Sequence, residues 1–164
     1  MSSETTIRPG DASDLEAIRS IAEAAYSLYI ERVGKRPAPM DDDYAALLEA
    51  GAVHVACDAA DQIVGFLVTA VHDDHLELTT VAVAPQQQGT GVGGRLIALA
   101  EDLAREHGRA DVRLYTNAAM TENLELYPRL GYRETGRRRE AGFDRVFFAK
   151  HVEPHIGDTP HISN

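Results

Sequence analysis

A glycine-rich turn at residues 88–94 carries the clearest chemical signal in this chain. It reads Gln-Gly-Thr-Gly-Val-Gly-Gly and stands between an apolar run at residues 76–83 and an apolar helical pattern that begins at Val92. This order predicts a strand, a turn and a helix N-terminus, where backbone N–H groups lack helical acceptors and the helix dipole favours negative charge. Such a turn binds phosphate groups without a charged side chain. We therefore expect a ligand that carries a pyrophosphate.

Other readings of the same turn have to be weighed. Gly89, Gly91 and Gly94 match the dinucleotide-binding pattern G-x-G-x-x-G, in which the glycines follow a strand directly and an acidic residue about 20 positions later binds the ribose. Here residues 85–88 intervene, Asp111 precedes the next strand instead of ending it, and too little chain follows for the rest of that fold. A nucleoside triphosphatase loop requires Gly-Lys-Ser/Thr, which is missing from the sequence. A purely structural glycine turn remains the alternative.

Composition limits the class of protein. The chain has 164 residues, 44% of them hydrophobic and 26% charged, which is ordinary for one globular domain. A net charge of −10 argues against nucleic-acid partners, and the sequence has neither a membrane-spanning apolar run nor the features of a signal peptide. The single cysteine, Cys57, excludes an internal disulfide and fits a reducing compartment. We expect a cytoplasmic domain over residues 1–152, without membrane partners, followed by a mobile tail at 153–164.

Periodicity and turn residues predict a mixed α/β fold. Strands are expected near residues 5–8, 52–57, 62–71, 76–83, 112–115, 132–135 and 145–150. Helices are expected from a capping box at residues 13–16 through about Arg32, from residues 41–43 to Gly51, from Val92 to Gly108, and from Thr121 to Gly131.

Two segments resemble signatures of the GNAT superfamily of N-acetyltransferases. Val83-Ala-Pro85 followed by Gln88-Gly-Thr-Gly-Val-Gly93 resembles its Q/R-x-x-G-x-G/A motif, and Leu126-Tyr-Pro-Arg-Leu-Gly-Tyr132 resembles its L-Y-x-x-L-G-F/Y segment. The resemblance covers nearly the whole chain. It implies a central, mostly antiparallel sheet with a splayed parallel strand pair, flanked by about four helices. It also implies acetyl-CoA as the acyl donor. We expect no metal, because four such residues in a row at a strand junction, His72-Asp-Asp-His75, are more typical of a polar turn.

The resemblance also implies which residues bind the donor. Backbone groups of the glycine turn would hold the pyrophosphate, and the exposed edge of the preceding strand would pair with the pantetheine arm. The residues so assigned are Val81, Ala82, Val83, Gln88, Gly89, Thr90, Gly91, Val92 and Gly93. Many members carry an asparagine seven residues before the motif tyrosine. Met120 stands there in this chain, and Asn123 is the candidate that replaces it.

Acetyl transfer to an amine needs a neutral amine, a stabilised oxyanion and a proton for the leaving thiolate. By resemblance Tyr127 is the general acid, because a phenol with a pKa near 10 is protonated at neutral pH; a core tyrosine is the alternative. Glu77 is the candidate base, acting through water, although strand alternation also explains it as a surface residue. Pro128 removes a helical hydrogen bond and predicts a bend beside Tyr127.

The acceptor pocket of this family is built largely from the first two helices and their link. The candidates here are Tyr26, Tyr29, Arg32, Arg36 and Met40. Arg32 or Arg36 could clamp a carboxylate, with solvated surface arginine as the alternative. The acceptor stays open among antibiotics, amino acids, polyamines, protein N-termini and lysine. Phe143, Phe147 and Phe148 suit either a homodimer or the core.

These observations predict an N-acetyltransferase that moves an acetyl group from acetyl-CoA to a primary amine by direct attack. The alternative is a non-catalytic module that binds CoA or acyl-CoA in a regulatory role.

Overall fold

The computed structural model describes residues 5–153, which form two compact units. Unit 1 contains the described residues up to Thr69 together with Thr79–Ile97, and unit 2 contains Ala70–Leu78 and the residues from Ala98 onward. The start of the chain at residues 1–4 and the expected tail, apart from Glu153, lie outside the described residues. A single domain over residues 1–152 stays a prediction.

The strands and helices follow one another in the order that the sequence predicts, except that the first helix is divided. The strands are β1 (Thr6–Pro9), β2 (Val53–Cys57), β3 (Ile63–Val71), β4 (Leu76–Val83), β5 (Asp111–Asn117), β6 (Arg133–Glu140) and β7 (Phe143–His151). The helices are α1 (Leu15–Tyr26), α2 (Tyr29–Val33), α3 (Tyr44–Glu49), α4 (Val92–Glu106) and α5 (Thr121–Arg129), with 3-10 turns η1 (Ala12–Asp14), η2 (Ala38–Asp41) and η3 (Pro85–Gln87). The strand order is β1-β2-β3-β4-β5-β7-β6, and β4 pairs with β5 in parallel, with Glu77 opposite Arg113. The mixed, mostly antiparallel sheet is confirmed.

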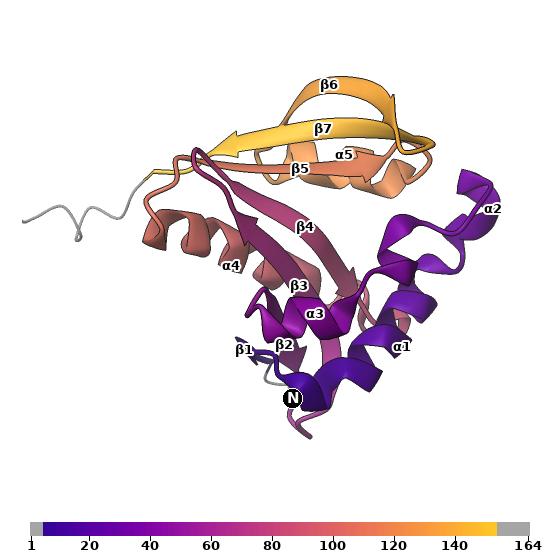
Figure 1. Cartoon of the computed structure of the whole chain (residues 1–164), viewed down its shortest axis with the longest axis vertical. Helices are drawn as coiled ribbons and strands as arrows, with labels where there is room; N and C mark the ends of the chain where they lie inside the picture. Colours follow the sequence, from indigo (N-terminus) through magenta and orange to yellow (C-terminus); the bar gives the residue numbers. More distant parts are fainter. Residues whose placement is uncertain (1–4, 154–164) are drawn as a thin grey trace, which may run out of the picture. The chain divides into compact units, whose positions relative to one another are not determined.

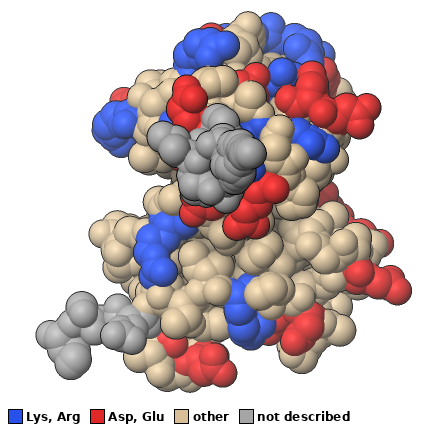
Figure 2. Space-filling view, turned by 90° about the vertical axis from the view of Figure 1, so that its left-hand side faces the viewer, with Lys and Arg blue, Asp and Glu red and all other residues tan. Residues whose placement is uncertain are grey.

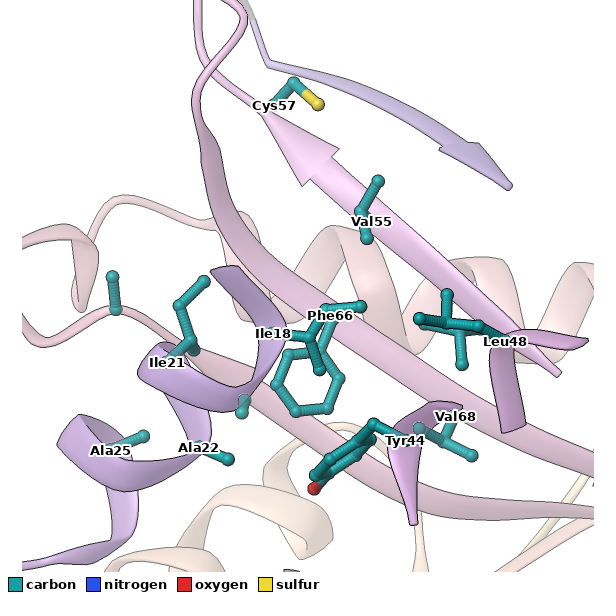
Figure 3. Close-up of a cluster of buried hydrophobic side chains, with 13 residues drawn as sticks. Ile18, Ile21, Ala22, Ala25, Tyr44, Leu48, Val55, Cys57, Phe66 and Val68 are labelled. Carbon is teal, nitrogen blue, oxygen red and sulfur yellow. The ribbon is translucent and has the colours of Figure 1, made fainter. Parts of the chain in front are cut away.

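The core of unit 1 lies between two helices and the first strands. Ile18 of α1 and Tyr44 of α3 meet Phe66 of β3, and the rings of Tyr44 and Phe66 are in edge-to-face contact at 5.3 Å. Figure 3 shows these side chains converging from the helices and the sheet, and Figure 1 shows α1 and α3 on the same face of β2 and β3. Cys57, at the end of β2, is buried within this cluster, as expected of a small apolar residue.

The predicted capping box at residues 13–16 is wrong by two residues. The box is formed by Asp11, whose side chain accepts from the Ser13 N–H, and by Asp14, whose side chain accepts from the Asp11 N–H. Asp14 is buried and also receives two hydrogen bonds from the Arg8 guanidinium, at 2.9 and 3.0 Å. This pairing with β1 selects Asp14 as the second member of the box.

The first predicted helix is also divided. It ends at Tyr26, and α2 begins at Tyr29, because the Ile30 N–H bonds the Ser27 carbonyl only three residues back and tightens the chain there. Leu28, between the two helices, is 54% exposed. The division places Tyr26 at the C-terminal end of α1.

Unit 2 packs α5 against β6 and β7 (Figure 1). Phe148 is buried beside Tyr127, whereas Phe143 and Phe147 lie half-buried beneath arginine guanidinium groups. Arg137, Arg138 and Arg139 of β6 pair with Glu134, Glu140 and Asp144. These ion pairs keep the basic side chains of β6 beside acidic ones, and Figure 2 shows basic and acidic side chains interspersed on the face that it draws.

Within residues 5–153, no helix combines the length and the apolar character that crossing a bilayer requires.

Candidate active site

The glycine turn of unit 1 leads from β4 through η3 into α4. Gly89 and Gly91 adopt φ values of +84° and +93°, a left-handed conformation that residues with a Cβ rarely adopt. The first internal bond of the helix runs from the Arg95 N–H to the Gly91 carbonyl at 3.1 Å, so the N–H groups of residues 92–94 precede it and have no acceptor within the helix. The turn therefore presents donors suited to an anion, on an exposed segment.

Two of the N–H groups expected to face the ligand are engaged within the turn itself. The Gln88 N–H donates to the Pro85 carbonyl and the Thr90 N–H donates to the Gln87 carbonyl, both at 3.3 Å. The Val92 side chain is buried and anchors the start of α4. The donors best placed for phosphate are therefore those at the start of α4.

In β4, the strand before the turn, backbone N–H and C=O groups point alternately toward β3 and away from it. The Ala84 N–H donates to the Val64 carbonyl of β3 at 2.8 Å, which sets Ala82 and Ala84 toward β3. Val81 and Val83 then direct their N–H and C=O groups to the opposite edge. The predicted pairing of this strand with an extended ligand thus depends on Val81 and Val83 rather than on Ala82.

Tyr127 of unit 2 is held by the way in which α5 ends. The Tyr132 N–H bonds the Tyr127 carbonyl at 3.0 Å and the Gly131 N–H bonds the Pro128 carbonyl at 3.1 Å, with Gly131 at φ +97°. This is a Schellman motif, and the ring contact between Tyr127 and Tyr132 is the apolar contact that accompanies it. Pro128 falls in the last turn, where the helix continues to Arg129. The predicted bend beside Pro128 stays a prediction.

The Tyr127 side chain is almost fully enclosed. It is 4% exposed and packs against the rings of Tyr132 and Phe148, with centroids 5.6 and 5.7 Å away. Burial raises the pKa of Tyr127 above its usual value near 10, because a phenolate loses hydration there. Tyr127 is therefore a neutral phenol at physiological pH.

Beside this ring lies a polar cluster that motif reasoning did not include. The Tyr132 hydroxyl donates to Glu101 of α4 at 3.0 Å, and the Lys150 ammonium donates to the same carboxylate at 3.2 Å. Lys150 also donates to the carbonyl of Leu130, the last residue before Gly131, at 2.9 Å. Glu101 and Lys150 thus fix the end of α5. No local pattern marks them, since they stand 31 and 18 residues from Tyr132.

Glu77 lies on β4 in the part that belongs to unit 2. Its side chain is 27% exposed and receives a hydrogen-bonded contact of 2.9 Å from Nε2 of His72. The His72 ring stacks on His75, which contacts Asp74. Among the described residues no group of three or more His, Cys, Asp or Glu side chains is placed to hold a metal ion.

Asn123 connects α5 to β5. Its amide Nδ2 donates to Thr116 Oγ1 at 3.0 Å and contacts the sulfur of Met120 at 3.8 Å. Thr116 and Met120 are both buried. The amide nitrogen of Asn123 is therefore used within the fold.

The residues predicted to form an acceptor pocket all belong to unit 1, but they differ in their contacts. The Tyr26 hydroxyl donates to the Val81 carbonyl at 3.2 Å, the Arg32 guanidinium lies 5.0 Å from the Tyr29 ring centre, and Met40 is buried. Arg36 is bound by two carboxylates, Glu23 at 2.6 Å and Asp41 at 3.0 Å. Of the two predicted clamps, Arg36 is already neutralised within the fold.

Comparison with known proteins decides the family. The model of the acetyltransferase (GNAT) family matches residues 15–132. The chain belongs to the GNAT family of acetyltransferases. The predicted resemblance is thereby confirmed, since the matching family is one of acetyltransferases.

Relatives and solved structures agree with this assignment. The chain is 36% identical over 129 residues to a mycothiol acetyltransferase of Gordonia bronchialis, covering 75% of this chain and 41% of the relative. It is 30% identical over 125 residues to that of Clavibacter sepedonicus, covering 76% and 40%. The chain thus spans about two fifths of the length of these two relatives.

The fold resembles the PaiA N-acetyltransferase of Thermoplasma acidophilum in complex with coenzyme A, with a TM-score of 0.77, 15% identity and coverage of 91% and 99% of the two chains. It also resembles the ribosomal-protein-S18-alanine N-acetyltransferase of Escherichia coli, with a TM-score of 0.69, 21% identity and coverage of 97% and 100%. At these identities the likeness concerns the fold.

Proposed function

We propose that this GNAT enzyme transfers the acetyl group of acetyl-CoA to a primary amine, which attacks the thioester directly. The observation that carries the proposal is the turn with Gly89 and Gly91 at positive φ, which opens α4 and presents N–H donors to an anion. These backbone groups would bind the pyrophosphate, and the edge of β4 at Val81 and Val83 would bind the pantetheine arm. Asn123 would contribute through its amide oxygen, because its nitrogen donates to Thr116.

Tyr127 would act on the leaving sulfur through its phenol hydroxyl. Burial keeps its phenol neutral, and the contacts with Tyr132 and Phe148 restrict the ring. Full transfer from a phenol with a raised pKa to a thiolate whose acid has a pKa near 8.5 runs uphill. Tyr127 therefore acts by donating a hydrogen bond as charge develops on sulfur. The acetyl–sulfur bond breaks as the acetyl–nitrogen bond forms. The amine proton passes to Glu77 and on to solvent, and the released thiolate takes its proton from solvent, so the step balances.

Glu77 would accept the amine proton, directly or through water. Its support is that the Glu77 carboxylate is partly shielded and lies in contact with His72. On the acceptor side, Arg32 or Arg36 would bind a carboxylate, and Arg36 would first have to leave Glu23 and Asp41. Tyr26, Tyr29 and Met40 would form the walls. The names of the relatives make an amine related to mycothiol the first acceptor to assay.

A thermal-shift titration with acetyl-CoA, CoA and NAD tests donor binding. Ligand at 100 times its Kd stabilises the folded state by about 2.7 kcal/mol, which for a chain of this size corresponds to a rise in Tm of roughly 5–10 °C. We expect this rise with both CoA species and none with NAD. A rise with NAD alone contradicts the proposal.

Turnover is tested by the release of CoA thiol over a panel of amines. We expect Tyr127→Phe to lower kcat by tenfold or more with a near-normal Kd for CoA. Full activity in this variant would remove Tyr127 from the mechanism. CoA binding without turnover on any amine would favour the regulatory module instead.

A further inference from the structure

Within unit 1, the backbone groups of β4 that point away from β3 can be identified one by one. The bond from the Ala84 N–H to the Val64 carbonyl fixes which residues face β3, and backbone directions alternate along a strand. The close approach of the Ala82 carbonyl to Gly65 of β3, where an added Cβ would lie 3.0 Å from that oxygen, agrees with this assignment. Val81 and Val83 therefore present their carbonyl groups on the opposite edge. Two residues of strand separate these carbonyls by about 6.6 Å.

Each of the two carbonyls is met by a side chain of this chain. The Tyr26 hydroxyl, at the end of α1, donates to the Val81 oxygen at 3.2 Å. The Gln88 side-chain amide, from the glycine turn, donates to the Val83 oxygen at 3.4 Å. Usual distances are about 2.7–2.8 Å for hydroxyl donors and 2.9–3.0 Å for amide donors, so both bonds are long. Gln88 is also exposed to water.

These contacts satisfy strand-edge acceptors with side chains that can move away. An exposed edge whose carbonyls lack donors invites pairing with another extended chain, and side chains that cover it prevent this. The Tyr26 ring packs against the core of unit 1 and reaches the edge through its hydroxyl, and Gln88 lies on a turn built around two glycines in the left-handed conformation. Another donor could take the place of these two side chains without a change in the backbone of β4.

We propose that Tyr26 and Gln88 hold the positions of the ligand's amide donors on the β4 edge, and that they give way when an extended ligand with amide N–H groups binds there. This inference rests on the proposed function, in which the pantetheine arm of CoA, which carries two amides, is that ligand. It assigns Tyr26 a role toward the donor in addition to the predicted wall of the acceptor pocket. The bonds of the ligand-free chain oppose binding, because each must be broken before the ligand forms its own.

The test is the affinity for CoA in Tyr26→Phe, measured by titration calorimetry. Losing one neutral hydrogen bond that competes with the ligand should lower the Kd for CoA by about two- to tenfold. The same measurement uses 3′-phosphoadenosine 5′-diphosphate, which has the pyrophosphate but no pantetheine arm. Its Kd should not change, because the β4 edge does not contact it.

Tyr44→Phe is the matched control. It removes another tyrosine hydroxyl of unit 1 that donates to a backbone carbonyl, that of Pro39, and keeps the ring against Phe66. We expect no change in its Kd for CoA. Gln88→Met removes the second donor from an exposed position, so a folding defect of one variant leaves the other informative. It should also tighten CoA binding.

The outcomes separate the two proposals. If the wild-type protein binds CoA but Tyr26→Phe and Gln88→Met bind it no more tightly, the proposed role of these two side chains on the β4 edge is refuted, while the proposal that the protein binds CoA stands. Equal tightening of CoA and 3′-phosphoadenosine 5′-diphosphate also refutes it, because the effect then does not come from the strand edge. If the wild-type protein binds neither ligand, both proposals fail.

Discussion

The C-terminal cap of α5 links the family motif to the position of Tyr127, and Gly131→Ala tests this link. Gly131 has φ +97°, and the bonds from Tyr132 to Tyr127 and from Gly131 to Pro128 close the motif around it. An alanine there adopts a conformation that L-residues avoid. Its Cβ would also lie 3.2 Å from Cε of Lys150, so the Lys150 side chain must shift by a few tenths of an ångström.

The expected loss of stability follows from these two effects. A left-handed alanine costs about 1–2 kcal/mol of unfolding free energy, or roughly 2–8 °C in Tm for a chain of this size. The Lys150 shift adds a smaller amount, because the contact is with the far part of a flexible side chain. Lys150 donates to the Leu130 carbonyl and to Glu101, so its displacement loosens the end of α5. We expect kcat to fall several-fold while the Kd for CoA stays within about twofold.

Gly108→Ala provides the matched control in the same unit. Gly108 ends α4 with the same pattern, in which the Arg109 N–H bonds the Ala104 carbonyl and the Gly108 N–H bonds the Arg105 carbonyl, at φ +71°. An added Cβ meets no atom within 4 Å there. This variant should lose similar stability and keep its kcat, measured for both variants at least 15 °C below their Tm.

The comparison of kcat decides the matter. If both variants lose stability and both keep full kcat, the cap does not position Tyr127 for chemistry. If Gly131→Ala is as stable as the wild-type protein, the strain at this residue has been misjudged. Urea denaturation and initial rates of CoA thiol release supply the two measurements.

Three further outcomes are expected. Asp14 has a pKa held below its usual value, chiefly by the hydrogen bonds from Arg8, so it contributes stability above pH 4 that is lost as pH falls through the lowered pKa. Asp14→Asn should therefore lower Tm at pH 7 by several degrees, and the difference from wild type should shrink toward pH 3; a constant difference contradicts this. Gly65→Ala should lose about 1–3 kcal/mol in urea unfolding, because its Cβ would lie 3.0 Å from the Ala82 carbonyl, and an unchanged midpoint would show that β4 can shift. Because burial raises the pKa of Tyr127, its ionisation should cause no fall in kcat up to pH 10. Any alkaline fall in kcat below pH 10 should therefore also be present in Tyr127→Phe.

Local pattern was enough for the order of the elements. The bounds of β4 agree with the apolar alternation of residues 76–83, and Gly51, Gly108 and Gly131 mark three helix ends at positive φ. Periodicity and glycine conformation are properties of neighbouring residues, so one sequence reveals them. The prediction of a capping box at residues 13–16 failed because Arg8 of β1 bonds Asp14, which serves as the second member of the box. The division between α1 and α2 was not predicted, because no glycine or proline marks it.

The sequence by itself determined the family, through two short motifs, and predicts a pyrophosphate ligand, through a glycine turn at a helix N-terminus. The tertiary structure alone decided the partners of each side chain. It joins Arg36 to Glu23 and Asp41, Asn123 to Thr116, and the Tyr26 hydroxyl to the Val81 carbonyl 55 residues away. Motifs encode backbone conformation, which depends on adjacent residues. Hydrogen-bond partners depend on which distant segments the hydrophobic core brings together, and no spacing in the chain records that.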